Sequence, residues 1–212
     1  MIKVLITDDH PVVRRGIRQI LEDDERIGIV NEAGNGKELF DRLKEQVYDV
    51  ILLDISLPGR SGLDLITEIK RTQQSVAILI LSMHSEALYA IKALKSGASG
   101  YLTKTSAPEE LLSAIFKVSK GERYISSSLA DTLAENLVSD TEKPLIQLLS
   151  SRELDVLRLL AEGKKVVQIA SELSLSPKTI STYRERILEK LKLHTTADLI
   201  RYAIMEGITG PE

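Results

Sequence analysis

The sequence predicts an α/β fold: a five-stranded, parallel, doubly wound sheet in residues 1–120, followed by a small all-α domain of four helices in residues 149–212. The first observation is the run Val-Ile-Leu-Leu at residues 50–53, which lacks a helical period and is typical of a strand buried on both faces of a parallel sheet. The second is the alternation of short apolar runs with amphipathic stretches over the first 120 residues. The third is a change at Ser151, after which apolar residues recur only at helical spacing.

Each strand of the predicted sheet is a short apolar run bounded by polar or turn residues. The expected strands are residues 2–7, 27–33, 49–53, 76–82 and 101–102. Helices are expected between them, where apolar residues recur every three or four positions. Pro11 and Pro108 are tolerated because each falls in a first turn. The expected helices are residues 11–21, 37–46, 62–71, 86–96 and 108–120.

Residues 121–148 change in composition and are predicted to form a linker. Gly121, the serine run 126–128 and Pro144 are loop and cap residues, although residues 129–137 have the pattern of a short helix. Ser176 is expected to cap a later helix whose first position is Pro177. The helices expected after the linker are residues 152–161, 166–173 and 177–191, and a fourth that starts at 195 or 196 and ends near 206.

Composition is ordinary for a soluble globular protein, with 212 residues, 43% apolar, 28% charged and a formal net charge of −3. No apolar run approaches the roughly 18–20 residues needed to cross a bilayer, so no membrane partner is expected. The absence of cysteine excludes disulfides and thiolate metal sites and suits the cytoplasm. Positive charge is local, because residues 164–192 hold seven Lys or Arg against three Glu, which points to nucleic acid.

Polar side chains follow four strands of the predicted sheet. Asp8 and Asp9 end the first strand and Asp54 ends the third, and these two strands are neighbours in a doubly wound sheet. Three acids at one edge repel one another unless a cation neutralises them, and oxygen ligands alone suit Mg²⁺ or Mn²⁺. Ser82 and Lys104 end the next two strands. The set is what transfer of a phosphoryl group to Asp54 requires, with the metal and Lys104 neutralising charge on the phosphoryl oxygens.

Two histidines flank these acids in the sequence, His10 and His84. A lone imidazole near acids is more often a surface residue than a ligand, and we expect both to be surface residues. His84 stands two residues after Ser82 and is a candidate for tuning access to the phosphoryl group.

Asp8-Asp9, Asp54 after an apolar strand, Leu57-Pro58-Gly59 with Gly62, Ser82, and Tyr101–Lys104 together resemble a two-component response-regulator receiver domain over residues 1–120. The resemblance implies a flavodoxin-like fold and phosphorylation of Asp54 by a sensor histidine kinase. It implies that Asp9 is a direct metal ligand, that Asp8 acts mainly through water, and that Ser82 and Tyr101 form a switch pair whose ring rotates inward. The implied metal site comprises Asp8, Asp9, Asp54 and the backbone carbonyl of Ser56.

One residue departs from the receiver pattern. Thr105 follows Lys104, where many receivers have proline. A cis peptide before a non-proline residue costs about 2.5–4 kcal/mol, so the usual cis geometry is disfavoured here and the reach of Lys104 is a question for the structure.

The helix expected at 177–191 has two faces. Ile180, Ile187, Leu188 and Leu191 fall on one face and are expected to be buried. The opposite face is polar, and by itself such a face is as readily an ordinary solvated surface.

The segments at 149–153, 169–173, 176–183 and 187–191, with the Gly163 break, resemble a LuxR-type helix-turn-helix domain over 149–207, so the whole chain resembles the NarL/FixJ class. That resemblance implies DNA contacts by Lys178, Ser181, Thr182, Arg184, Glu185, Arg186 and Lys190.

Within this set, Arg184 and Arg186 are expected at phosphates, and Glu185 either accepts from cytosine or points to water. The last helix carries an apolar stripe, part of which packs inward while the rest serves dimerisation in the family. The dimerisation candidates are Leu199, Ile200 and Ala203. A two-fold dimer predicts an inverted-repeat site with half-sites one DNA turn apart.

The sequence therefore predicts a cytoplasmic, DNA-binding transcriptional response regulator whose phosphorylation promotes dimerisation and promoter binding. The expected partners are a sensor histidine kinase, double-stranded promoter DNA, a second copy of the chain and, as a further candidate, RNA polymerase. No enzymatic activity is expected beyond the chain's own Mg²⁺-dependent phosphoryl transfer and dephosphorylation. Two alternatives stay open: a phosphohydrolase, although Ser56 stands where such enzymes use a second acid, and an interaction module that is never phosphorylated.

Overall fold

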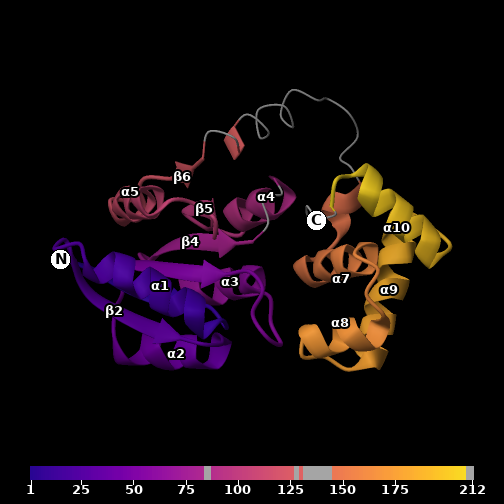
Figure 1. Cartoon of the computed structure of the whole chain (residues 1–212), viewed down its shortest axis with the longest axis horizontal. Helices are drawn as coiled ribbons and strands as arrows, with labels where there is room; N and C mark the ends of the chain where they lie inside the picture. Colours follow the sequence, from indigo (N-terminus) through magenta and orange to yellow (C-terminus); the bar gives the residue numbers. More distant parts are fainter. Residues whose placement is uncertain (84–86, 127–128, 131–144, 209–212) are drawn as a thin grey trace. The chain divides into compact units, whose positions relative to one another are not determined.

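The computed structural model describes residues 1–83, 87–126, 129–130 and 145–208 (Figure 1). The chain divides into two compact units, Met1–Leu137 and Val138–Glu212. Among the described residues, every helix is too short or too polar to span a membrane.

The first unit is built on one parallel sheet with the strand order β2-β1-β3-β4-β5-β6. The order places β1 beside β3, as the sequence predicts, so the residues that follow these strands emerge at one edge. The predicted doubly wound sheet is confirmed. The strands are β1 (Ile2–Thr7), β2 (Ile27–Ala33), β3 (Val50–Asp54), β4 (Ala77–Ser82), β5 (Gly100–Thr103) and β6 (Tyr124–Ile125).

The prediction of five strands was wrong by one. β6 pairs parallel to β5, in a stretch that the sequence assigns to the linker. The Tyr124 hydroxyl donates to Glu110 Oε1 at 3.0 Å, and burial together with that carboxylate raises the pKa of Tyr124 to about 12. A two-residue edge strand has no apolar run to mark it, because ladder hydrogen bonds and one side-chain contact hold it in place.

Helices cover both faces of the sheet, because alternate strand residues point to opposite sides. Val4, Leu52 and Leu79 face a core shared with α1 and α5, and their sequence neighbours Leu5, Ile51 and Ile78 are equally buried. The predicted helix over 86–96 is described only from Ala87 onward. The helices are α1 (Pro11–Glu22), α2 (Gly36–Glu45), α3 (Gly62–Thr72), α4 (Ala87–Lys95) and α5 (Pro108–Ser119).

In its described residues, 145–208, the second unit contains the four predicted helices, preceded by a short 3₁₀ turn, η1 (Leu145–Leu148). Ser176 accepts the Thr179 N–H at 3.1 Å and Pro177 occupies the first helical turn, as the sequence predicts. Leu188 is only half-buried, unlike Ile180, Ile187 and Leu191, which were expected on the same face. The predicted short helix over 129–137 falls almost wholly outside the described residues. The four helices are α7 (Ser151–Ala161), α8 (Val166–Glu172), α9 (Pro177–Leu191) and α10 (Thr196–Met205).

Candidate functional site

The carboxylates of Asp8, Asp9 and Asp54 meet at the carboxyl edge of the sheet. β1 and β3 run side by side with Thr7 paired to Leu53, so the residues that follow are brought together. One oxygen of each acid, together with a ring nitrogen of His10, lies within 4.8 Å of the others. Asp8 and Asp54 are 1% and 2% exposed, and the side chain of Asp9 is 31% exposed. The cluster is therefore buried at its base and open at Asp9.

Lys104 lies between two of these acids. Its Nζ is 2.6 Å from Asp8 Oδ2 and 2.7 Å from Asp54 Oδ2, and the side chain is 6% exposed. The Lys104 N–H donates to the Ser82 carbonyl at 2.7 Å, which fixes the start of the loop after β5. Every peptide bond among the described residues is trans, as expected for Lys104-Thr105. The trans loop delivers the ammonium to the acids.

Burial and charge set the protonation of this group. Burial raises the pKa of Asp54, the Lys104 ammonium lowers it and the Asp8 carboxylate raises it, and the net direction is upward. Burial alone would lower the pKa of Lys104, but Asp54 and Asp8 outweigh it and the pKa is raised. One ammonium faces two buried carboxylates with a third nearby. The local excess of negative charge favours a further cation.

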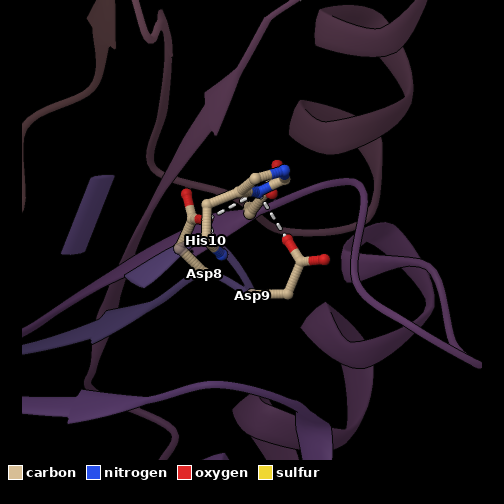
Figure 2. A group of neighbouring side chains, drawn as sticks. Asp8, Asp9 and His10 are labelled. Atoms are coloured by element: carbon tan, nitrogen blue, oxygen red, sulfur yellow. Dashed lines mark hydrogen bonds and ion pairs between the residues drawn. The ribbon is translucent and has the colours of Figure 1, made fainter. Parts of the chain in front are cut away.

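His10 contacts two of the acids directly, whereas the sequence predicted only a surface residue near them. Figure 2 shows its ring directed at Asp8 and Asp9, with Nδ1 3.2 Å from Asp8 Oδ1 and 2.7 Å from Asp9 Oδ1. The His10 backbone N–H also donates to Asp8 Oδ1 at 2.8 Å. The His10 side chain is 62% exposed, so it is a surface residue as expected, but its Nδ1 points toward the carboxylates of Asp8 and Asp9. The position of His10 directly after Asp8-Asp9 is the sequence feature that indicates this contact.

The loop after β3 is held by backbone contacts. The Ser56 N–H donates to Asp54 Oδ1 at 3.1 Å, and the Gly62 N–H donates to the Ile55 carbonyl at 2.8 Å. A Cβ at Gly62 would lie 2.0 Å from the Asp54 carbonyl oxygen. Gly62 therefore permits a close approach of α3 to the site. The sequence marks it as part of a motif without revealing this positioning role.

Ser82 and Tyr101 lie on neighbouring strands and are 1% and 3% exposed. The Tyr101 ring is already buried. The exchange of this ring between outward and inward positions stays a prediction.

The polar face of α9 is the candidate DNA surface. Lys178, Thr182, Glu185 and Arg186 are exposed. The hydroxyl of Thr182 donates to the Lys178 carbonyl at 3.1 Å, which leaves its oxygen free to accept from a base or a water. Ser181 and Arg184 are partly buried, and the Ser181 hydroxyl donates to the Pro177 carbonyl.

Lys190 differs from these residues because it is paired with a carboxylate of another helix, and its expected DNA contact stays a prediction. Its Nζ donates to Glu153 Oε2 at 2.6 Å, and the Glu153 side chain is only 3% exposed. Lys190 therefore links α9 to the start of α7. This contact joins residues 37 positions apart, which helical spacing alone does not reveal.

Two of the three dimerisation candidates are buried within the helical unit. Leu199 and Ala203 have no exposed surface because they pack into the unit's own core, and Ile200 is only partly exposed. Ile204 and Met205 are 57% and 81% exposed on the same helix. The exposed part of the apolar stripe of α10 therefore lies at the end of the helix, and the residues before it are buried or only partly exposed.

Comparison with known proteins agrees with the two-unit description. Residues 4–116 match the family model of the response regulator receiver domain, and residues 147–203 match that of bacterial regulatory proteins of the luxR family. The response regulator UvrY of Escherichia coli (strain K12) is 41% identical over 214 residues, covering 100% of this chain and 98% of UvrY.

Solved structures of the protein RcsB are similar to this chain over nearly its whole length. RcsB from Salmonella enterica serovar Typhimurium, bound to promoter rprA in the presence of the phosphomimetic BeF3−, superposes with a TM-score of 0.67 at 31% identity, covering 95% of this chain and 97% of that one. A structure of two RcsB dimers bound to two parallel DNAs gives a TM-score of 0.59 at 32% identity, covering 96% and 98%.

Proposed function

Because the chain belongs to the response-regulator family, with a receiver domain joined to a luxR-type regulatory domain, we propose that it is a transcription factor controlled by phosphorylation of Asp54. The observation that carries the proposal is the pairing of the buried Asp54 carboxylate with the Lys104 ammonium, 2.7 Å away and beside two further acids. This acid lies at the end of β3, at the edge of the sheet. A sensor histidine kinase is the proposed donor and the cytoplasm the proposed setting.

The donor set suits a divalent ion, because oxygen atoms of three acids converge while one ammonium balances only part of their charge. Asp8, Asp9 and Asp54, with the Ser56 carbonyl, would hold Mg²⁺ or Mn²⁺. When bound, the ion neutralises charge on the phosphoryl oxygens and orients the phosphoryl group.

The chain's own residues then act in order. Asp54 attacks phosphorus through one carboxylate oxygen as the bond from phosphorus to the donor nitrogen breaks. Lys104 is near enough to move from Asp54 Oδ2 to a phosphoryl oxygen without leaving the site. Ser82, at the end of the next strand, is proposed to donate its hydroxyl to the same group, and Tyr101 to follow it. The receiver's own role as catalyst of this transfer and of its reversal by water is part of the proposal.

Phosphorylation adds close to two negative charges at Asp54, and the proposed response is assembly of two copies on promoter DNA. The promoter-bound RcsB structure and the structure of RcsB dimers on DNA support both parts. α9 would enter the major groove with Lys178, Thr182 and Arg186 outward, and RNA polymerase is a proposed further partner.

Selection of bound sequences from a random pool of duplex DNA tests the proposal. The full-length chain is used with Mg²⁺, with and without a small phosphoryl donor. The expected result is enrichment of an inverted repeat that depends on the donor in the wild-type chain and is lost with Asp54→Asn. Enrichment that is the same with and without the donor would contradict phosphorylation control. No enrichment under either condition would contradict specific DNA binding.

A further inference from the structure

The ring of His10 lies beside two of the clustered acids, with its Nδ1 directed at their carboxylates (Figure 2). Its Nδ1 is 2.7 Å from Asp9 Oδ1 and 3.2 Å from Asp8 Oδ1. Asp8 is almost fully buried, and both acids belong to the proposed metal site. A nitrogen donor is therefore already directed into a set of oxygen donors.

The spacing of these atoms suits one coordination sphere. In an octahedral site with ligands at about 2.1 Å, neighbouring ligands are about 3 Å apart and opposite ligands about 4.2 Å apart. One ligand atom from each of Asp8, Asp9, His10 and Asp54 lies within 4.8 Å of the others. Small side-chain movements would bring all four to a common ion.

The backbone gives the His10 ring freedom to serve in this way. His10 is the N-cap residue of α1 but its side chain makes no capping hydrogen bond. Its backbone N–H is fixed to Asp8 Oδ1, and Pro11 begins the helix immediately after it. The backbone is thus anchored at the acids while the ring has no structural task in α1.

We propose that His10 Nδ1 is a ligand of the divalent ion in the receiver, so that the site binds imidazole-favouring transition-metal ions better, relative to Mg²⁺, than three carboxylates alone would. Mg²⁺ is a hard ion that prefers oxygen, whereas Co²⁺, Ni²⁺ and Zn²⁺ accept imidazole nitrogen readily. The inference rests on the metal site of the proposed function and adds the nitrogen ligand and its selectivity.

The test uses Co²⁺ as the probe and the full-length chain. Affinities for Co²⁺ and Mg²⁺ are measured by calorimetry at a pH well above the ordinary imidazole pKa of about 6.5. Proton NMR of the Co²⁺ form then detects the hyperfine-shifted ring signals of a ligating histidine. Wild type is compared with His10→Ala, and His84→Ala and His194→Ala are controls that remove the other two histidines.

The expected result is a fall of at least about tenfold in the preference for Co²⁺ over Mg²⁺ in His10→Ala, with loss of the shifted ring signals in that variant alone. An unchanged preference, or shifted signals that persist in His10→Ala, would overturn the proposal. So would tighter binding of both metals in that variant, because it would mean that the ring acts only as a competing cation. Circular dichroism checks that each variant is folded.

Failure of this inference differs from failure of the proposed function. A wild-type chain that binds Mg²⁺ and accepts phosphate on Asp54, but shows no histidine signals with Co²⁺, overturns only the nitrogen ligand. A wild-type chain that binds neither metal overturns the site itself.

Discussion

At the residue scale, the position of Lys104 between two acids affects both the stability of the receiver and its chemistry. Its ammonium stabilises two buried carboxylates at 2.6 and 2.7 Å, and it lies beside Asp54, the acid proposed to accept the phosphoryl group. Burying like charges side by side is unfavourable unless a cation intervenes. Without metal, Lys104 is that cation, and we expect a metal ion to relieve it of part of this role.

We expect Lys104→Met to destabilise the metal-free receiver by about 3–5 kcal/mol at neutral pH, because it leaves two buried carboxylates without their partner. Added Mg²⁺ is expected to stabilise the variant more than the wild type. Urea unfolding with and without Mg²⁺ measures both. Lys44→Met removes an exposed ion pair to Asp41 at 3.0 Å and is the control, with an expected change of less than about 1 kcal/mol. Equal stability of the two variants would contradict the role of Lys104.

Gly62 provides a second test at this scale. Gly62→Ala would place a methyl group 2.0 Å from the Asp54 carbonyl oxygen, so the loop after β3 must move. We expect a loss of about 1–3 kcal/mol in stability and slower phosphorylation of Asp54. Gly16→Ala is the matched control, because nothing lies within 4 Å of a Cβ there and its helical position favours alanine. A Gly62→Ala chain as stable as Gly16→Ala would show that the approach is not tight.

At the element scale, α7 and α9 are joined through Glu153. Its carboxylate accepts from Lys190 Nζ and from the Ser150 N–H, each at 2.6 Å. Burial alone would raise the pKa of Glu153, but these hydrogen bonds outweigh it and the pKa lies below its ordinary value of 4.5. The carboxylate therefore stabilises the helical unit in its ionised form.

A pH dependence follows. Because the folded pKa of Glu153 is depressed, its stabilising contribution is complete above the unfolded value of 4.5 and is lost as the pH falls through the lower folded value. We expect stability to fall more steeply below about pH 4.5 in wild type than in Glu153→Gln. Urea unfolding across this range measures the slopes, with Glu189→Gln, an exposed position of α9, as control. Identical slopes in wild type and Glu153→Gln would contradict the depressed pKa.

The exposed face of α9 gives a prediction about DNA. Arg186→Gln is expected to weaken binding roughly tenfold on all sequences and to make the slope of log affinity against log salt shallower by about 0.9, as for loss of one phosphate contact. Arg201→Gln, exposed on α10, is the control. Fluorescence anisotropy at several salt concentrations provides the slopes. A changed sequence preference with an unchanged slope would place Arg186 at a base.

Local pattern predicted most of these elements and failed where distant contacts decide. The apolar runs located β1 to β5, and strand order then brought Asp8, Asp9 and Asp54 together. Pattern did not reveal β6, whose two residues are held by pairing with β5. It also identified the stripe of α10 without showing which part meets the other helices, so Leu199 was expected outside and is buried. Similarly, Lys190 carries charge on a basic helix, but its partner lies 37 residues away.

At the scale of the whole molecule, two units of different architecture divide the work. The receiver provides a largely buried cluster of charged side chains at a sheet edge, and the helical unit provides a capped helix with an exposed polar face. Chemistry at Asp54 is proposed to govern association of two copies and hence DNA binding. The proposed control of DNA binding therefore depends on phosphorylation of Asp54.

The most direct measurement is mass spectrometry of the full-length chain after incubation with Mg²⁺ and acetyl phosphate, with the modified peptide identified after cleavage. We predict one acid-stable, base-labile acyl phosphate on Asp54 that requires the divalent ion, is absent from Asp54→Asn and is retained in Asp41→Asn, which alters an exposed acid. Labelling of Asp54→Asn equal to that of wild type, or no Mg²⁺-dependent label on the wild-type chain, would contradict the account.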